Sequence, residues 1–320
     1  MSQLTAVRTA SRTALSTQWW HLSTHAGGFD VADGIIGDLV TPLAAQAQVL
    51  RAARWFYTRS VEPSSAVQVR LHILAQPATI ERLQTVHQVL LKRNGGTLAA
   101  LPARQSVSTP ATHGYYLRNI EDADPQLEAE LFKYGGVDGL QLAEEVFELS
   151  SELAAWGTQR FAKMHSRSAF AALVLFDSAR SMMRGSRSAS WADRRRISWE
   201  YYWDSHLKTC TPDLGARGPA VREAMMNQIN AKAPAFQSLM AATAAESAVH
   251  NWRRRWFRAL DTYLYRADKA RVSRSAQHLT VHQAHMTLNR LGFSPREEAV
   301  LGLYARTWSV DRERALFNRN

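Results

Sequence analysis

The sequence is short of cysteine and of long apolar runs. Cys210 is the single cysteine among 320 residues, which excludes a disulfide framework and any zinc or iron–sulfur site built from several cysteines. No stretch reaches the roughly 18–20 apolar residues that span a bilayer, so we predict no membrane segment. The first residues lack the apolar core of a secretion signal, and a reducing cytoplasm is the expected location.

Signature motifs of several large enzyme classes are also missing. The sequence contains no GxxxxGKS/T or GxGxxG run, so a bound nucleotide is not indicated. It contains no GxSxG or HExxH run, so neither a serine-hydrolase elbow nor a metalloprotease helix is predicted. We therefore expect ordinary side chains to carry any chemistry, with no cofactor and no metal ion.

Positive charge is what the sequence has in excess. Its 39 lysines and arginines against 28 acidic residues give a formal net charge of +11. This excess favours an acidic partner, and charge alone leaves nucleic acid, an anionic surface and an acidic peptide open. Solvated helix faces are the alternative interpretation of the arginine clusters. The clusters are Arg180, Arg184, Arg187, Arg194, Arg195 and Arg196, and then Arg253, Arg254, Arg255, Arg258, Arg266, Lys269, Arg271 and Arg274.

Strand patterns occur early in the chain and helical patterns late, which predicts an α+β fold. Residues 55–58 have strand composition and residues 67–73 alternate apolar and polar side chains, so the two segments should form a hairpin. We expect a loose tail over 1–17 and a single catalytic domain over 18–320. Helices are predicted over 33–54, 79–93, 138–156, 162–183, 191–207, 221–229, 235–271, 280–290 and 294–308, a loop over 101–114 and a strand over 114–120.

Histidines repeat along one side of a predicted helix near the C-terminus. His278, His282, His285 and Asn289 are spaced by four, three and four residues and so share one stripe. A helix with an apolar side and an adjacent imidazole side suits the wall of a cleft. The histidines are either structural or include a general acid or base, and a zinc site would need a further ligand from elsewhere. The apolar side is Val281, Ala284, Leu288 and Leu291.

An aromatic segment is the second candidate for chemistry. It runs from Trp199 to Asp204 and places Glu200 and Asp204 four residues apart, on one face of a helix. Tyr202 and Asp204 beside large rings suit a pocket that binds flat groups and moves protons. The simpler interpretation is an aromatic core patch with a solvated acidic edge.

Three ordered motifs resemble one known family. Residues 53–59, ARWFYTR, and residues 67–72, VQVRLH, resemble the WFFIRY…HLRLR hairpin of the thiopeptide-type bacteriocin biosynthesis domain. Residues 132–139, FKYGGVDG, resemble its ERYGG(P)EG motif, and residues 285–292, HMTLNRLG, resemble HMxxNRLxG. The same domain is the glutamate-elimination domain at the C-terminal end of lantibiotic dehydratases.

Two departures from the eliminating branch bear on the activity. In that branch an arginine pair and the arginine of the RYGG motif are linked to a glutamylated serine or threonine. Here Arg70 matches the first arginine of the pair, His72 stands at the second, and Lys133 replaces the RYGG arginine. Neither exchange is conservative where a guanidinium fork binds a carboxylate. The resemblance then implies a stand-alone pyridine synthase of thiopeptide biosynthesis, with a split-dehydratase eliminase and a non-catalytic leader-binding relative as alternatives.

The reaction implied by this resemblance is a formal (4+2) aza-cycloaddition without a metal or redox cofactor. Two dehydroalanines of one modified peptide join, and water and the leader peptide leave, which yields a pyridine-centred macrocycle. The implied partner is a precursor peptide with an acidic leader and azoles, and no nucleic acid or membrane is expected. We expect catalytic roles for His285 and Tyr202 (acid and base), Asp204 (orientation), and Arg70 and Asn289 (hydrogen bonding). Binding of substrate or leader is expected of Arg59, His72, Lys133, Trp199, Arg194, Arg195, Arg196 and His282.

Overall fold

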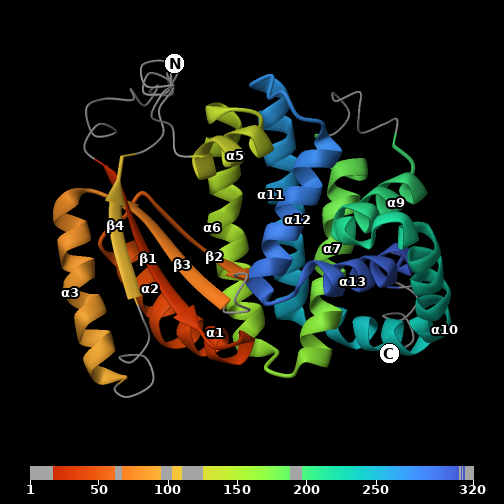
Figure 1. Ribbon diagram of the computed structural model, residues 1–320, viewed down its shortest axis with the longest axis horizontal. Coiled ribbons are helices and arrows are strands. Elements are labelled where there is room, and N and C mark those ends of the chain that lie inside the picture. The colour runs from red at the N-terminus through yellow and green to blue at the C-terminus, as the bar shows by residue number, and fades with distance from the viewer. Residues whose placement is uncertain are drawn as a thin grey trace, which may run out of the picture. The chain divides into compact units, whose positions relative to one another are not determined.

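The chain forms two compact units, residues 1–112 and 113–320, in a computed structural model (Figure 1). The first unit holds the strands and the second is helical, so the predicted α+β class is confirmed. Within the part of the chain that is described, every helix is too short or too polar to cross a membrane. The tail predicted over 1–17 lies outside the described residues except for Thr17. The described residues are 17–61, 67–94, 103–109, 125–187, 197–309, 311 and 313.

A four-stranded antiparallel sheet with the order β2-β3-β1-β4 organises the first unit. Helices connect β1 to β2 and β3 to β4, which gives the βαββαβ order of a ferredoxin-like fold. The strands are β1 (Gln18–Ala26), β2 (Arg54–Val61), β3 (Val67–Ala75) and β4 (Ala103–Ser108).

The predicted hairpin is confirmed. β2 and β3 pair antiparallel from Arg54 opposite Leu74 to Val61 opposite Val67. In β3 every second side chain is buried, beginning at Val67, and the residues between are half-buried. One face of the sheet is therefore apolar and the other carries polar side chains.

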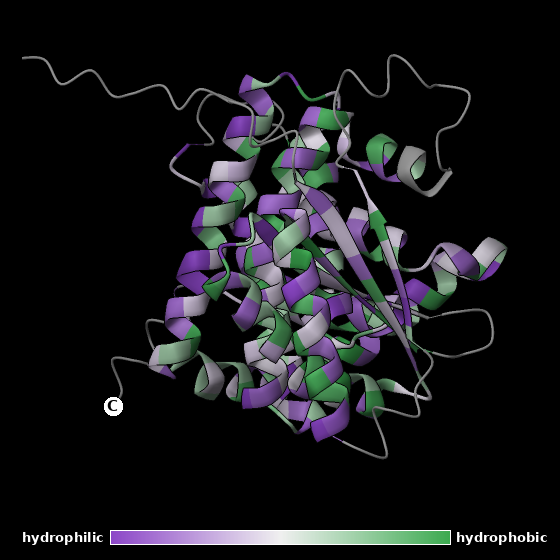
Figure 2. Cartoon of the chain, turned by 90° about the vertical axis from the view of Figure 1, so that its left-hand side faces the viewer, coloured by the Kyte–Doolittle hydropathy of each residue, from purple (hydrophilic) through white to green (hydrophobic). Residues whose placement is uncertain are grey.

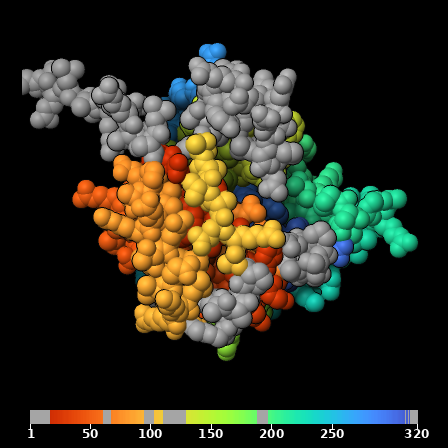
Figure 3. Space-filling view, turned by 60° about the vertical axis from the view of Figure 1, so that its left-hand side comes forward, coloured from red at the N-terminus to blue at the C-terminus, as the bar shows by residue number. Residues whose placement is uncertain are grey.

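Two strands of the sheet were not predicted. In β1 the adjacent Trp19 and Trp20 are both buried, which disturbs the alternation that marks a strand in sequence. All six residues of β4 are exposed, and the strand lies at the surface of the unit beside α3 (Pro77–Arg93) (Figure 3). An exposed edge strand needs no apolar face, so its sequence resembles a loop. The loop prediction is wrong over residues 103–108.

The helical segment between β1 and β2 is interrupted. It consists of α1 (Phe29–Ile35), a π-helical stretch η2 (Ile36–Val40) and α2 (Thr41–Val49). The prediction of one helix over 33–54 is correct in its middle and wrong at its end, where Arg51 takes a left-handed φ of 57° and β2 follows.

The second unit contains a bundle in which α6, α7, α11 and α12 pack against one another (Figure 1). α13 packs against α7, α9, α10 and α12. Hydrophobic and hydrophilic segments alternate along the helices, as expected for amphipathic helices that pack with one side against their neighbours (Figure 2). The helices are α5 (Pro125–Tyr134), α6 (Val137–Arg160), α7 (Met164–Arg184), α9 (Trp199–Cys210), the 3-10 helix η5 (Pro212–Arg217), α10 (Gly218–Ala244), α11 (Ser247–Lys269), α12 (Ala276–Leu291) and α13 (Pro295–Thr307).

The long helix predicted over 235–271 is two helices. α10 runs through Pro234 and ends at Ala244, and Glu246 then adopts an extended conformation before α11 starts. No glycine or proline marks this break, so sequence alone gave no signal for it. The strand predicted over 114–120 and residues 191–196 of the helix predicted over 191–207 lie outside the described residues.

Candidate functional site

The histidine stripe of α12 forms one side of a buried helix. His278, His282, His285 and Asn289 are all half-buried, whereas the neighbouring apolar residues of the helix are fully buried. The helix begins at Ser275, whose side chain accepts a hydrogen bond from the His278 backbone, and it ends at a left-handed glycine. The predicted imidazole stripe beside an apolar, buried side of the helix is confirmed.

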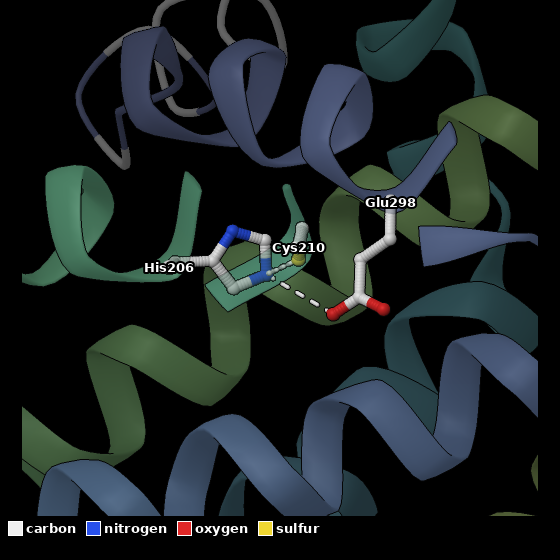
Figure 4. A group of neighbouring side chains, drawn as sticks. All are labelled: His206, Cys210 and Glu298. Carbon is white, nitrogen blue, oxygen red and sulfur yellow. Dashed lines mark hydrogen bonds and ion pairs between the residues drawn. The ribbon is translucent and has the colours of Figure 1, made fainter. Parts of the chain in front are cut away.

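Glu298 joins two histidines from different helices. Nδ1 of His285 lies 2.6 Å from Oε2 of Glu298, and Nε2 of His206 lies 3.1 Å from Oε1. The His206 contact is drawn in Figure 4. The side chains of Glu298 and His206 are each 1% exposed, whereas that of His285 is 37% exposed. The half-buried His285 is thus backed by a buried carboxylate and a second, buried histidine.

The position of Glu298 follows from how α13 begins. Ser294 and Glu297 form a capping box, with a proline at the first turn, and this fixes the start of the helix. Glu298 follows in the same turn, where the helix N-terminus favours a negative charge. Burial alone favours the neutral acid, but hydrogen bonds from His206 and His285 hold its pKa at about 2. The carboxylate is therefore ionised and in turn raises the pKa of His285.

Tyr202 and Cys210 lie on the buried side of this carboxylate. The Cys210 sulfur is 3.7 Å from Nε2 of His206, and it lies within 4.8 Å of a Glu298 carboxylate oxygen. The Tyr202 hydroxyl is buried and has no hydrogen-bond partner within the described residues. Burial, and then the nearby negative charge of Glu298, raise the pKa values of both groups. The thiol and the phenol therefore remain protonated near neutral pH.

The same cluster is the place where a metal ion could be held. Ligand atoms of His206, Cys210 and Glu298 all lie within 4.8 Å of one another (Figure 4). A histidine, a cysteine and a carboxylate are ligands that zinc accepts. Nε2 of His206 contacts both Glu298 and Cys210 and so already joins the three side chains, and the geometry does not require an ion.

His282 has the opposite electrostatic character to His285. Its ring centroid lies 4.3 Å from that of His278, which contacts the Lys133 carbonyl oxygen through Nε2 at 2.9 Å. Burial, and then the positive charges of His278, His285 and Lys133, lower the pKa of His282 to about 4. Tyr134 packs edge-on against it. One helical turn of α12 therefore carries a neutral imidazole next to one that favours protonation.

The aromatic segment of α9 separates its predicted site residues. Asp204 is half exposed and forms an ion pair with Arg306 at 2.7 Å, while Tyr202 faces the core. Trp199 donates its indole N–H to the Arg306 carbonyl oxygen at 3.0 Å. The structure thus brings Tyr202 to the Glu298 cluster and directs Asp204 to another side of the helix.

Two predicted residues of the first unit share the polar face of the sheet. Arg70 donates from Nε to the Ser23 hydroxyl at 3.0 Å, and Nδ1 of His72 lies 2.8 Å from Nδ1 of His21. Burial, and then the charge of Arg70, lower the pKa of His21 to about 4. Phe56 stacks on the His72 ring with centroids 4.6 Å apart. This face combines a guanidinium, imidazoles and a flat ring.

Arg59 belongs to the other face of the sheet. It lies opposite Val69 in the β2–β3 register, and it forms an ion pair with Asp33 of α1 at 2.6 Å. Its side chain is 1% exposed, so it contributes a buried contact between helix and sheet. Lys133 in the second unit pairs with Glu130 at 2.7 Å. Arg194, Arg195 and Arg196 lie outside the described residues.

Sequence reasoning missed Glu298 and His206. Glu298 falls on the buried side of α13 with Leu301 and Ala305, and a carboxylate among such residues is the signal that marks it. His206 and Cys210 are likewise four residues apart on the buried side of α9. A buried ionisable residue in an apolar stripe requires a hydrogen-bonding partner. Here Glu298 is the partner of His206, and His206 is a partner of Glu298.

Comparison with solved structures yields distant relatives of the same fold. The structure titled TsrL is 16% identical, with a TM-score of 0.56 over 91% of this chain and 94% of its own. A pyridine synthase, TbtD, from thiomuracin biosynthesis is 15% identical, with a TM-score of 0.57 over 93% and 99%. The tRNA-dependent lantibiotic dehydratase MibB from Microbispora sp. 107891 is 19% identical, with a TM-score of 0.54 over 96% of this chain and 29% of its own.

A search of curated protein sequences finds no match to this chain. The family described as lantibiotic biosynthesis dehydratase C-term matches residues 19–308. This match includes both units, and it contains the hairpin of the first unit and the His285 motif of the second. The chain therefore belongs to the lantibiotic biosynthesis dehydratase C-terminal family.

Proposed function

We propose that this chain is a pyridine synthase that closes a modified peptide into a macrocycle by a formal (4+2) aza-cycloaddition. The observation that carries the proposal is the placement of His282 and His285 on a single turn of α12, with Nδ1 of His285 held 2.6 Å from the buried Glu298 carboxylate. The opposite pKa shifts of the two imidazoles agree with an acid and a base side by side. A pyridine synthase, TbtD, has the same fold and nearly the same extent as this chain, which supports the assignment.

In the first step, a base must remove a proton from the substrate and an acid must donate one to it. The amide before one dehydroalanine reacts as its iminol, so the nitrogen loses a proton and the carbonyl oxygen gains one. His282 is neutral and accepts the amide proton, while protonated His285 donates to the oxygen. The azadiene then forms two carbon–carbon bonds with the second dehydroalanine. Holding both alkenes in contact removes translational entropy beforehand.

The second step uses the same two side chains in a further round. The new ring carries a hydroxyl group, which leaves as water when an acid protonates its oxygen and a base removes a proton from the neighbouring ring carbon. The bond from ring carbon to the leader nitrogen then breaks, the leader amide takes up a proton, and a ring proton passes to the base. The formation of an aromatic pyridine drives this elimination. Glu298 and His206 keep His285 oriented and protonated between the rounds.

The other predicted site residues are proposed to hold the peptide. Arg70, His72 and Phe56 offer a polar and aromatic face suited to amides and azole rings. Asn289 continues the histidine stripe and is proposed as a hydrogen-bond donor. Tyr202 is proposed to support Glu298 from the buried side, and Lys133 and Trp199 are proposed to bind the peptide. Arg59 is buried in its ion pair with Asp33, and Asp204 pairs with Arg306 away from the Glu298 cluster, so we propose no role in binding or orientation for either residue. An acidic leader is the proposed partner of Arg194, Arg195 and Arg196.

Glutamate elimination is the second candidate function. It is favoured by the structural match to the lantibiotic dehydratase MibB, in which the matched region makes up 29% of the MibB chain. In that reaction a base removes the α-proton of a glutamylated serine and glutamate leaves with its ester oxygen. His72 and Lys133, in place of the arginines expected for that branch, count against it.

Mass spectrometry of the reaction products tests the proposal. The chain is incubated with an azole-containing precursor that carries two dehydroalanines, and separately with a glutamylated precursor. Loss of water plus leader from the first peptide supports the synthase. Loss of glutamate from the second assigns the eliminase instead. Binding of either peptide without any mass change assigns a non-catalytic leader-binding protein. His285→Ala should abolish the synthase product.

A further inference from the structure

α7 and α11 lie side by side and run in the same direction. Asp177 near the middle of α7 pairs with Arg253 at 2.7 Å, and Ser181, one turn later, donates to the Phe257 carbonyl oxygen at 2.8 Å. The register continues past the end of α7, where the Arg187 guanidinium donates to the Thr262 hydroxyl at 3.0 Å. The outer faces of the two helices are therefore neighbours along this length.

Exposed cations collect on these outer faces. Arg254, Arg258 and Lys269 are separated by four and eleven residues, so they lie along one side of α11. Lys269 lies over the Tyr265 ring at 5.5 Å, and Arg187 lies over the same ring at 5.8 Å. We call this set the basic stripe. It consists of Arg184, Arg187, Arg254, Arg258 and Lys269, all of them exposed.

α11 itself offers little exposed negative charge to the basic stripe. α11 has two acidic residues, Asp261 and Asp268, and the first is buried and accepts hydrogen bonds from Ser186 and the Arg187 backbone. Among the residues that the structure describes, Arg184, Arg258 and Lys269 form no ion pair.

Arg255 and Arg266 of the same helix provide the contrast. They form ion pairs with Glu152 and Glu145 of α6. The exposed arginines of α11 on the side of α6 are thus paired with carboxylates, whereas Arg258 and Lys269 of the stripe form no ion pair within the described part of the chain.

The aromatic rings beside the stripe argue for a peptide over a nucleic acid. Binding of single-stranded nucleic acid depends on rings whose faces are free to stack on bases. Here Tyr265 is already covered by Arg187 and Lys269, and Arg180 lies over Phe257 at 5.1 Å. What remains accessible is charge, which suits carboxylates. From Arg254 to Lys269 the stripe is about 22 Å long, the span of about seven residues of extended chain.

We infer that the basic stripe of α7 and α11 docks an acidic segment of the peptide substrate. This inference rests on the proposed function, because that function supplies a peptide as substrate. The docked segment carries several glutamates or aspartates, which pair with the cations of the stripe. Such pairing accelerates encounter and positions the chain, and it weakens with salt.

Fluorescence anisotropy with the full chain tests the docking directly. The probe is a labelled, glutamate-rich peptide of about seven residues that contains no dehydroalanine. The variant Arg258→Gln/Lys269→Gln removes two charges from the stripe, and we expect binding to weaken about tenfold at low salt. The matched control Arg255→Gln/Arg266→Gln removes two charges from the same helix at its paired side. We expect it to weaken binding by less than about twofold.

Three results would overturn the inference. The first is equal weakening by both double variants, because that would report net charge alone. The second is full binding by the stripe variant. The third is displacement of the peptide by a single-stranded oligonucleotide at a lower concentration than by unlabelled peptide, because that would assign the stripe to nucleic acid.

Kinetics separate a failure of this inference from a failure of the proposed function. If the probe docks on the stripe but no pyridine forms from any precursor, the proposed reaction alone is wrong. If pyridine forms, the stripe variant should raise the KM for a full-length acidic precursor about tenfold, and the control variant should not. An unchanged KM in the stripe variant, with pyridine still formed, refutes the docking alone.

Discussion

Glu298 is the single residue on which the chemistry of the candidate site depends. Its two oxygens accept hydrogen bonds from His285 and His206, so one carboxylate orients two rings. It also favours the protonated form of His285, while His282 one turn away is held neutral by burial and by positive neighbours. A chain without this carboxylate would have two neutral imidazoles near pH 7 and no strong acid for the departing oxygen.

Replacing Glu298 by Gln should lower the pKa of His285. The neutral amide removes the hydrogen-bonded negative charge that favours the imidazolium, so the proton is held less tightly. Because an acid catalyst must be protonated, the rate falls as pH rises through its pKa. The falling limb of the pH–rate profile should therefore move to lower pH, and NMR titration of His285 should show the same shift. Glu200→Gln, an exposed carboxylate of α9, is the control and should leave both unchanged.

Replacing Tyr202 by Phe separates two roles for that residue. The hydroxyl is buried and lacks a partner among the described residues, so its removal should leave the free energy of unfolding unchanged or raise it by up to about 1 kcal/mol. If the residue supports Glu298 from behind, product formation should slow by less than about tenfold. A loss of more than about 100-fold with unchanged urea stability would make Tyr202 the direct acid or base.

The sequence predicted the exposed half of the site and missed the buried half. His285 and His282 were found because helical spacing reveals a stripe on one element without knowledge of the others. Glu298 follows His285 by thirteen residues and reaches it only through the packing of α13 on α12. Spacing along one helix cannot report that contact, and the capping signal in this turn comes from the neighbouring Glu297.

At the scale of elements, prediction succeeded where a segment is amphipathic by itself. β3, α3, α12 and α13 each show a clean period or a capping signal, and the structure confirms all four. β4 became a strand through its pairing with β1, although its own residues are all exposed. The same holds for the break between α10 and α11, which tertiary packing sets without a glycine or proline.

Gly302 shows how closely α13 approaches α9. A Cβ placed on Gly302 would lie 2.7 Å from both Nδ1 and Cε1 of His206. Glycine-to-alanine changes in helices normally stabilise by about 1 kcal/mol. Here the clash should dominate, displace His206 from Glu298, and reduce the free energy of unfolding by about 1–3 kcal/mol.

Urea unfolding measures the free energy of unfolding of Gly302→Ala, with Gly34→Ala as the matched control. Gly34 lies in α1, and a Cβ there meets no atom within 4 Å, so the control should be stabilising. Equal stabilisation by both substitutions would show that the contact between α13 and α9 has room for a methyl group.

At the scale of the whole molecule, the two units respond to acid through histidines of different kinds. In the first unit His21 has a folded pKa of about 4, below the value of about 6.5 in an unfolded chain. The unfolded state therefore binds more protons between these values, and stability falls as pH drops from about 6.5 towards 4. Burial lowers the pKa of His87 in the same unit, which adds a contribution of the same sign.

The second unit contains opposing contributions over the same range. His282 acts in the same direction as His21, because its folded pKa of about 4 is also depressed. His285 acts in the opposite direction, because its pKa is higher in the folded protein than in an unfolded chain. Its stabilising contribution is complete below the unfolded pKa of about 6.5 and is lost as the pH rises through the raised folded pKa. Glu298, with a folded pKa of about 2, keeps its full contribution until the pH falls below about 4.5.

We therefore expect the first unit to open before the second when the pH is lowered from 7 to about 4.5. The contribution of His21 alone is about 2 kcal/mol, after allowing for solvent around a half-buried ring. Hydrogen–deuterium exchange, read separately for peptides of β1–β3 and of α6–α12, measures the loss of protection in each unit. His21→Gln should remove most of the pH dependence in the first unit, because the amide cannot take up a proton. Two results would contradict this prediction: opening of α6–α12 at a higher pH than β1–β3, or an unchanged pH dependence of exchange in His21→Gln. Either result would mean that the neutral His21 of the folded first unit does not set its sensitivity to acid.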